Sequence, residues 1–299
     1  MYLGVDIGGT DIKFGVVNAE GRIVARAAVP TPKTSAEAVA DAVAAGVKQL
    51  SAAFPAETVG VGTPGIVAPD GRVSAANLPF ADTPLADLIA ARIGRTAALG
   101  NDANCAALGE AAASGEDDLL LVTLGTGVGG GIVTGGKPVV GAHGGAGEIG
   151  HMCIRVGGRA CPCGKRGCFE QYASASALTA AAEAAAAAHP DSVLAAYAKD
   201  GMDGKVFFRA VADGCPAAAA VLDAYLTDLA AGLESLQSIF DPAVIVLAGG
   251  ITEAGDALLA PLMQKLGADF PLKLSSLRSD AGVIGAAALG REEAARHAD

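Results

Sequence analysis

The segment Tyr2-Leu3-Gly4-Val5-Asp6-Ile7-Gly8-Gly9-Thr10-Asp11-Ile12-Lys13-Phe14-Gly15-Val16-Val17 decides the fold. Its two apolar runs predict strands over 2–7 and 12–17, joined by a tight turn at Gly8-Gly9-Thr10. The pattern then predicts a third strand at 23–29, and after it helix 34–53, strand 57–62, helix 84–93, strand 97–99 and helix 103–113.

The same order of elements begins again at residue 118. We expect strand 118–124, a glycine-rich tip at 125–131, strand 131–134, a helical region at 174–213, helix 216–239, strand 243–248, helix 254–267, strand 271–275 and helix 281–296. This repetition predicts an internally duplicated α/β protein, with an N-terminal lobe at 1–113 and a C-terminal lobe at 114–299. The final helix, 281–296, is expected to return to the first lobe.

The composition excludes several classes of function. The 299 residues carry a net charge of −11 with a pI near 4.8, so neither nucleic acid nor an anionic membrane would be attracted to the surface. The first residues lack a basic export signal, and no apolar run reaches the roughly 18 residues of a membrane span. We therefore expect a cytoplasmic protein.

Two glycine-rich tips at matched places indicate phosphate binding. Glycines let backbone N–H groups approach an anion closely, and the second tip contains Thr126 and Gly127. A single tip would be an ordinary hairpin, but two that face each other would hold a nucleotide triphosphate. Asp6 could hold Mg²⁺ directly or through water. The expected nucleotide contacts are Asp6, Gly8, Gly9, Thr10, Lys13, Thr126 and Gly127, with Gly249 and Gly250 beside the adenosine.

A zinc site is predicted by His151, Cys161, Cys163 and Cys168, because His with three thiolates is a standard tetrahedral ligand set. The alternatives are a chance cluster or disulfides, which a reducing cytosol disfavours. The flanking Glu148 and Glu170 are better placed to accept hydrogen bonds from the hydroxyl groups of a ligand. The remaining cysteines, Cys105, Cys153 and Cys215, are expected to be buried thiols.

The pair Asn101-Asp102 lies between a strand and a helix, where ligand sites of α/β proteins gather. One of the two could simply cap the helix. Together they suit a sugar, since a carboxylate can accept a hydroxyl proton while an amide binds neighbouring hydroxyls. Gly65 could offer backbone groups, and Asn77 is either a turn residue or a ligand contact.

These motifs resemble the ROK family of bacterial sugar kinases and sugar-responsive repressors. The resemblance rests on Asp6-Ile7-Gly8-Gly9-Thr10, Asn101-Asp102, the tip at 125–131, Gly147-Glu148-Ile149-Gly150-His151 and the three cysteines, in that order. It implies an actin-like/hexokinase ATPase fold with two ribonuclease-H-like lobes, and a homodimer. The repressors carry an N-terminal DNA-binding segment, whereas this sequence starts at the phosphate strand.

The resemblance implies that Asp102 is the catalytic base. It further implies sugar contacts at Asn101, Glu148, His151 and Glu170, with Gly65 in the sugar-side loop, and zinc at His151, Cys161, Cys163 and Cys168. Residues 170–174 look most like the glucokinases, so we expect ATP- and Mg²⁺-dependent phosphorylation of glucose at its 6-hydroxyl. The alternatives are N-acetylglucosamine, N-acetylmannosamine, fructose or allose as the sugar, polyphosphate as the donor, or a non-catalytic sugar sensor.

Overall fold

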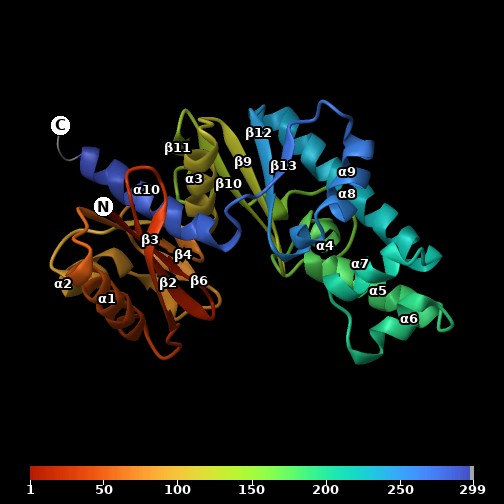
Figure 1. Ribbon diagram of the computed structural model, residues 1–299, viewed down its shortest axis with the longest axis horizontal. Helices are drawn as coiled ribbons and strands as arrows, with labels where there is room; N and C mark the ends of the chain where they lie inside the picture. Colours follow the sequence, from red (N-terminus) through yellow and green to blue (C-terminus); the bar gives the residue numbers. More distant parts are fainter. Residues whose placement is uncertain (297–299) are drawn as a thin grey trace. The chain divides into compact units, whose positions relative to one another are not determined.

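The computed structural model describes residues 1–296, which form two compact units (Figure 1). The first unit comprises residues 1–121, 131–147 and the chain from Ser276 on, and the second comprises 122–130 and 148–275. The unit boundary at 121–122 lies a few residues beyond the expected lobe boundary at 113–114, inside a strand. The last helix belongs to the first unit.

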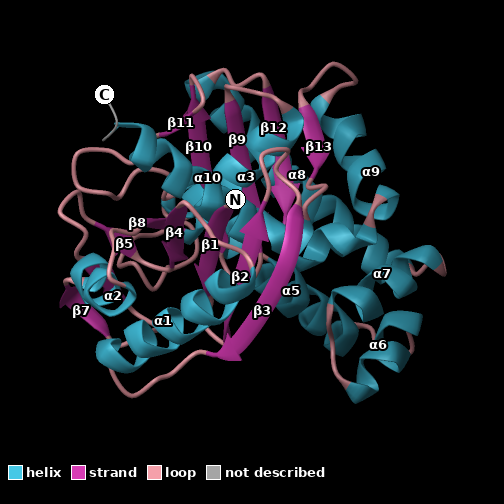
Figure 2. Cartoon of the chain, turned by 60° about the vertical axis from the view of Figure 1, so that its left-hand side comes forward, coloured by secondary structure: helices cyan, strands magenta, loops and turns pink. Residues whose placement is uncertain are grey.

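The first sheet is built from the hairpin that opens the sequence. Its strands are β1 (Tyr2–Ile7), β2 (Asp11–Val17), β3 (Ile23–Pro30), β4 (Thr58–Thr63) and β8 (Ala98–Asn101), in the order β3-β2-β1-β4-β8 (Figure 2). β1 is antiparallel to β2 and parallel to β4, which is parallel to β8. The carboxyl ends of β1, β4 and β8 therefore meet at one edge, where ligand sites of such sheets form.

The two faces of β1 have different neighbours because side chains alternate along a strand. Leu3, Val5 and Ile7 are fully buried in a core that includes apolar side chains of α1 (Ala36–Ala53). The other face meets α10 (Ala281–Arg296) so closely that a Cβ on Gly4 would lie 1.9 Å from the Val283 carbonyl oxygen. Asp6 is on this second face.

Glycines also bring α10 against its other neighbours. A Cβ on Gly60 in β4 would lie 1.7 Å from the carbonyl oxygen of Ala286, and one on Gly285 would lie 1.5 Å from that of Cys105. Cys105 is in α3 (Asp102–Ser114), which follows β8. Only glycine permits these close backbone approaches, so the glycines determine where α10 packs.

A small sheet between β4 and α2 (Leu85–Ile93) was not predicted. Its strands are β5 (Ile66–Val67), β6 (Val73–Ala75) and β7 (Phe80–Thr83), in the order β5-β6-β7. Strands of two to four residues are too short to show an alternating pattern. Leu78 and Phe80, both nearly fully buried, connect this sheet to the first core.

The second sheet repeats the first. It contains β9 (Leu119–Leu124), β10 (Val128–Thr134), β11 (Lys137–Pro138), β12 (Val244–Ala248) and β13 (Leu272–Leu274), in the order β11-β10-β9-β12-β13. Replacing each strand by its counterpart gives the order of the first sheet, as the duplication predicted. The expected glycine tip at 125–131 is too long, because β10 already begins at Val128.

Helices make up most of the second unit. They are α4 (Glu170–Ala173), α5 (Ala175–Ala188), α6 (Val193–Tyr197), α7 (Gly204–Ala212), α8 (Pro216–Phe240) and α9 (Asp256–Leu266), with short 3₁₀ turns at Ile149–His151 (η1), Ala198–Asp200 (η2) and Gly250–Ala254 (η3); a fourth, Arg278–Asp280 (η4), precedes α10 in the first unit. The long α8 contacts α4, α5, α7 and α9. Within residues 1–296, none of the helices combines the length and apolarity needed to cross a membrane.

Because α10 packs so closely against its neighbours, a Gly→Ala substitution that usually stabilises a helix should here destabilise the protein. Gly→Ala inside a helix usually stabilises it by about 0.5–1 kcal/mol. Gly285→Ala should instead destabilise the protein by about 2–4 kcal/mol, because the new methyl group overlaps the Cys105 carbonyl. Thermal and urea unfolding would measure the change. Gly204→Ala, at the first residue of α7 with open space around it, is the control and should be neutral or slightly stabilising.

Candidate functional site

The first glycine tip is an exposed turn between β1 and β2. The Gly8 N–H donates to the Asp11 carbonyl at 2.9 Å, and a Cβ on Gly8 would lie 2.9 Å from the same oxygen. Gly9 and Thr10 are exposed, so their backbone N–H groups are accessible to a ligand. The buried Thr31 hydroxyl donates to the Gly8 carbonyl at 2.8 Å. Thr31 was not predicted from the sequence, where its one signal was its place two residues after the third predicted strand.

Asp6 lies beside this tip in a largely desolvated position. A Cβ on Gly282 of α10 would lie 2.9 Å from its carboxylate carbon, and Lys13 is its cross-strand partner in β2. Burial raises the pKa of Asp6 to about 6, with a smaller upward contribution from the charge of Asp102, while Lys13 opposes the shift. A divalent cation at this carboxylate would relieve the cost of its charge.

Asn101 holds the second carboxylate in place. Its side-chain oxygen accepts from the N–H groups of Ala103 and Asn104 at 2.9 and 3.1 Å, which makes it the N-cap of α3. Its amide nitrogen donates to the Gly65 carbonyl at 3.0 Å. Gly65 itself needs glycine, since its φ is +96° and a Cβ would lie 2.3 Å from the Ser74 carbonyl. Asn101 thus joins the Gly65 loop to the start of α3.

Asp102 is the first residue of α3, and one of its two carboxylate oxygens is already engaged. Oδ1 accepts from the Ala103 N–H at 2.9 Å. Burial raises the pKa of Asp102, and the hydrogen bond from Ala103 opposes that shift. A carboxylate with a raised pKa and a second oxygen without that bond has the properties of a general base.

The second glycine tip contacts Glu170. The Glu170 Oε2 atom accepts from the Val128 N–H at 3.3 Å, and a Cβ on Gly127 would lie 2.0 Å from the same oxygen. Thr126 is exposed at the end of the tip. The other carboxylate oxygen, Oε1, lies 3.9 Å from Cys161 Sγ. Glu170 therefore lies between the tip and the cysteine cluster, a connection that sequence spacing did not indicate.

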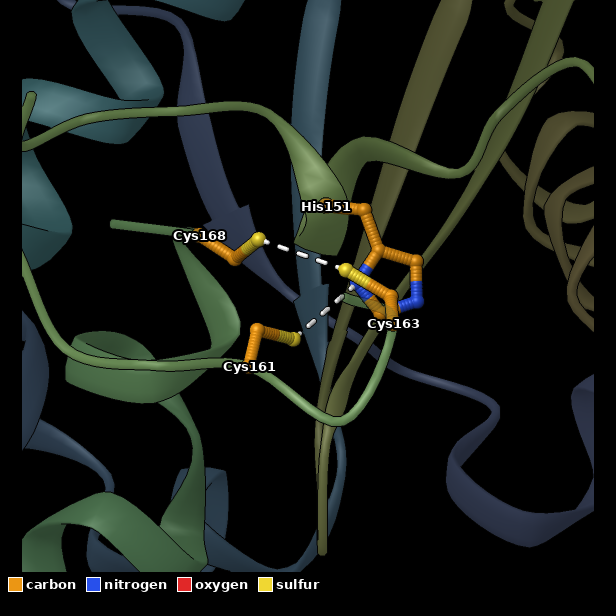
Figure 3. Close-up of side chains that lie close together, drawn as sticks. All are labelled: His151, Cys161, Cys163 and Cys168. Atoms are coloured by element: carbon orange, nitrogen blue, oxygen red, sulfur yellow. Dashed lines mark hydrogen bonds between the residues drawn. The ribbon is translucent and has the colours of Figure 1, made fainter. Parts of the chain in front are cut away.

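The four predicted metal ligands converge on one point (Figure 3). His151, Cys161, Cys163 and Cys168 each offer a ligand atom, and all four atoms lie within 4.8 Å of one another. His151 Nδ1 is 3.8 Å from Cys161 Sγ, and the Sγ atoms of Cys163 and Cys168 are 3.6 Å apart. Zn–S bonds of about 2.3 Å place tetrahedral ligands about 3.8 Å apart, so the cluster fits Zn²⁺.

The histidine ring connects this cluster to a carboxylate. Nδ1 faces the thiols, while Nε2 lies 3.9 Å from Glu148 Oε2. Both residues come from one short turn, in which the His151 N–H donates to the Glu148 carbonyl at 3.1 Å. A metal on Nδ1 would fix the ring and therefore the direction of Nε2.

Tyr172 anchors the cysteine loop to the helices behind it. Arg155 and Arg159 of the loop lie over its ring, 4.8 and 4.7 Å from the centroid, and its hydroxyl accepts from the Arg159 N–H at 2.7 Å. Arg155 also forms an ion pair with Asp228 of α8. Of the other cysteines, Cys105 and Cys215 are buried as expected, but Cys153 is exposed, which corrects that expectation.

A cavity of about 420 Å³ lies beside Gly250. Its walls come from the starts of α5 and α7 and from η3, and include Leu178, Phe208, Ile251, Lys205 and Glu253. Gly249 precedes it with φ of +103°, and a Cβ there would lie 2.2 Å from the Leu124 carbonyl. A cavity lined by both apolar and charged side chains suits a flat heteroaromatic base.

The structure distributes the predicted residues over its two units. Asp6, Lys13, Gly65, Asn101 and Asp102 lie in the first unit; Thr126, Gly127, Glu148, Glu170, Gly249, Gly250 and the four metal ligands lie in the second. Asn77 is exposed in the turn between β6 and β7.

The ROK family model matches residues 2–293. The glucokinase of Streptomyces coelicolor is 38% identical, with 98% of each chain covered. The N-acetyl-D-glucosamine kinase of Salmonella typhimurium is 36% identical over 84% of each chain. Among solved structures, the ROK family glucokinase from Streptomyces griseus in complex with glucose and AMPPNP is 37% identical, with a TM-score of 0.81, and the match covers 97% of this chain and 99% of that one.

The raised pKa of Asp6 predicts a stability that depends on pH. Its folded pKa of about 6 exceeds the unfolded value near 3.8, so the folded state loses stability as pH rises between these values. Asp6→Asn removes that cost. In the absence of nucleotide and Mg²⁺, the variant should be more stable than the wild type by about 1–3 kcal/mol at pH 7.5 and by much less at pH 4. Urea unfolding at both pH values measures this; a difference that does not vary with pH contradicts it.

Proposed function

The chain belongs to the ROK family, and on that premise we propose that it is an ATP-dependent sugar kinase that transfers phosphate to the 6-hydroxyl of glucose. The observation that carries the proposal is Asp102, a largely desolvated carboxylate at a strand end, in a chain similar to glucokinases over almost its whole length. A sensor that only binds sugar would need neither this base nor two phosphate tips.

Asp102 acts as the general base. The oxygen of the 6-hydroxyl attacks the γ-phosphorus, the bond from that phosphorus to the β,γ-bridging oxygen breaks, and ADP leaves with the bond's electrons. The hydroxyl proton passes to Asp102 Oδ2, since Oδ1 is held by the Ala103 N–H. Burial raises the pKa of this carboxyl, which makes it a stronger proton acceptor than an exposed aspartate.

The glycine tips position the phosphates. Phosphoryl transfer depends mainly on positioning and on stabilising charge, which backbone N–H groups and a cation supply. Asp6 is the proposed Mg²⁺ residue, and bound Mg²⁺ would neutralise charge on the phosphate oxygens. Lys13, Thr10 and Thr126 are further proposed nucleotide contacts. The cavity beside Gly250 is the proposed place of the adenine base.

The cysteine cluster is proposed as a structural zinc site. His151, Cys161, Cys163 and Cys168 supply the complete tetrahedral set, so no position remains for a reacting group. When bound, the metal would hold the loop that carries Glu148, His151 and Glu170. These three residues, with Asn101, the Gly65 loop and Asn77, are the proposed contacts of the sugar hydroxyls.

N-acetylglucosamine is a second candidate substrate. The Salmonella relative is an N-acetyl-D-glucosamine kinase at 36% identity, so the same site could accept an N-acetyl group. The homodimer and the cytoplasmic location stay predictions; size-exclusion chromatography with light scattering would test the former.

A sugar panel tests the proposal. ADP release with ATP and Mg²⁺ would be measured for glucose, mannose, fructose, allose, N-acetylglucosamine and N-acetylmannosamine. The highest kcat/KM is expected with glucose. A preference for an N-acetyl sugar would keep the mechanism and replace the substrate, whereas turnover of none of them would refute the proposal.

The carboxylate of Asp102 can be replaced by an amide of the same shape. Asp102→Asn should keep glucose affinity but lower kcat by about 10²–10⁴-fold, the usual contribution of general base catalysis. Steady-state kinetics and calorimetric glucose titration measure the two effects. Asp87→Asn, an exposed change on α2, is the matched control. A near-normal kcat for Asp102→Asn would exclude it as the base.

Metal removal tests the role of the cluster. Cys163→Ser should lower the zinc content and weaken glucose binding by about tenfold, because the loop that holds Glu148 and Glu170 loosens. Cys153→Ser, an exposed thiol outside the cluster, should change neither quantity. Elemental analysis and calorimetry provide the readouts. Unaltered glucose affinity in fully demetallated protein would show that the metal does not position the sugar contacts.

A further inference from the structure

Three consecutive carbonyl oxygens of the first glycine tip are bound by the segment that follows β3. The Thr31 hydroxyl donates to the Gly8 carbonyl and the Thr31 N–H donates to the Thr10 carbonyl, both at 2.8 Å. The Lys33 Nζ atom donates to the Gly9 carbonyl between them. We call Thr31 and Lys33 the carbonyl bracket.

The bracket fixes the direction of the backbone N–H groups of the tip. In a trans peptide the C=O and N–H bonds point in opposite directions, and the described chain contains no cis peptide bond. Holding the carbonyls of Gly8, Gly9 and Thr10 therefore turns the N–H groups of the next three residues away from the bracket. Successive N–H groups with a common direction form an anion-binding nest.

The Thr31 side chain makes a hydrogen bond that is separate from the β-sheet pairing. The bond from the Thr31 N–H to the Thr10 carbonyl extends the pairing of β2 with β3, which any residue but proline could do. The hydroxyl bond to Gly8 lies outside that pairing and needs Ser or Thr. Thr31 is 6% exposed, so this hydroxyl is buried against the tip.

The bracket also supplies positive charge where the tip has none. Residues 8–11 contain no basic side chain and end in the exposed Asp11, which would repel phosphate. Lys13 faces Asp6 in the sheet register. The Lys33 ammonium contacts the tip backbone directly, so it offsets the charge of Asp11 near a bound polyphosphate.

We propose that Thr31 and Lys33 are positioning residues for the phosphates of the nucleotide: they bind the tip carbonyls so that the opposite N–H groups point at the phosphate oxygens. This inference rests on the proposed function only in taking a magnesium nucleotide as the ligand.

Calorimetric titration with Mg·ADP tests the bracket without requiring turnover. Thr31→Val keeps the shape and removes the hydroxyl, so Mg·ADP should bind about tenfold more weakly. Thr31→Ser restores the hydroxyl and should recover affinity to within about twofold of the wild type, which a purely packing role would not predict. Lys33→Met, an exposed change that leaves the fold intact, should weaken binding by about three- to tenfold. Glucose affinity should be unchanged in all three variants.

Thr34→Val is the matched control, because Thr34 is an exposed threonine in the same segment; it should bind Mg·ADP as the wild type does. Wild-type affinity in both Thr31→Val and Lys33→Met would overturn the proposal. So would equal losses of glucose and nucleotide affinity, or failure of Thr31→Ser to recover binding. Failure of the proposed function is distinguishable: a wild-type chain that binds Mg·ADP through the bracket but phosphorylates no sugar refutes the kinase and supports the bracket.

Discussion

Two largely desolvated carboxylates, Asp6 and Asp102, constrain the first unit. Asp6 lies near the carboxyl end of β1 and Asp102 directly follows β8, and burial raises the pKa of both. The glycines at Gly4, Gly60 and Gly282 let α10 cover Asp6, and Asn101 fixes the start of α3 around Asp102. A fold optimised for stability alone would not place two acids where desolvation disfavours their charged forms. The energetic cost of desolvating these carboxylates is explained when one is a cation ligand and the other a base.

The sequence predicted most of the fold because its signals are local. Apolar runs separated by glycine turns gave the hairpins, and their repetition gave the two matching strand orders. The sheet of β5, β6 and β7 escaped because its strands are too short for a pattern, and the start of β10 was misplaced because its glycines, Gly129 to Gly131, read as a turn. At Gly131 a Cβ would lie 2.4 Å from the Ala103 carbonyl, so that glycine serves close packing.

The structure brings together those candidate residues that lie close to one another in the sequence. The histidine and three cysteines lie within one short segment, and their side chains meet in the structure. Contacts between distant segments were not readable: Glu170 meets the backbone of the second tip 42 residues away, and Thr31 reaches the first tip 23 residues away. Cys153 looked like a buried thiol from its neighbours but is exposed in the loop. Spacing in the sequence can identify the ligands of one ion, whereas contacts between distant segments can be identified only from the three-dimensional fold.

The proposed division of roles is that Asp6 serves the magnesium nucleotide while Asp102 serves the sugar hydroxyl. The most direct measurement is calorimetric titration of Asp6→Asn and Asp102→Asn, each with glucose and with Mg·AMPPNP. Asp6→Asn is expected to lose nucleotide affinity and keep glucose affinity, and Asp102→Asn is expected to keep both. Wild-type nucleotide affinity in Asp6→Asn, or loss of nucleotide affinity in Asp102→Asn, would contradict this division of roles.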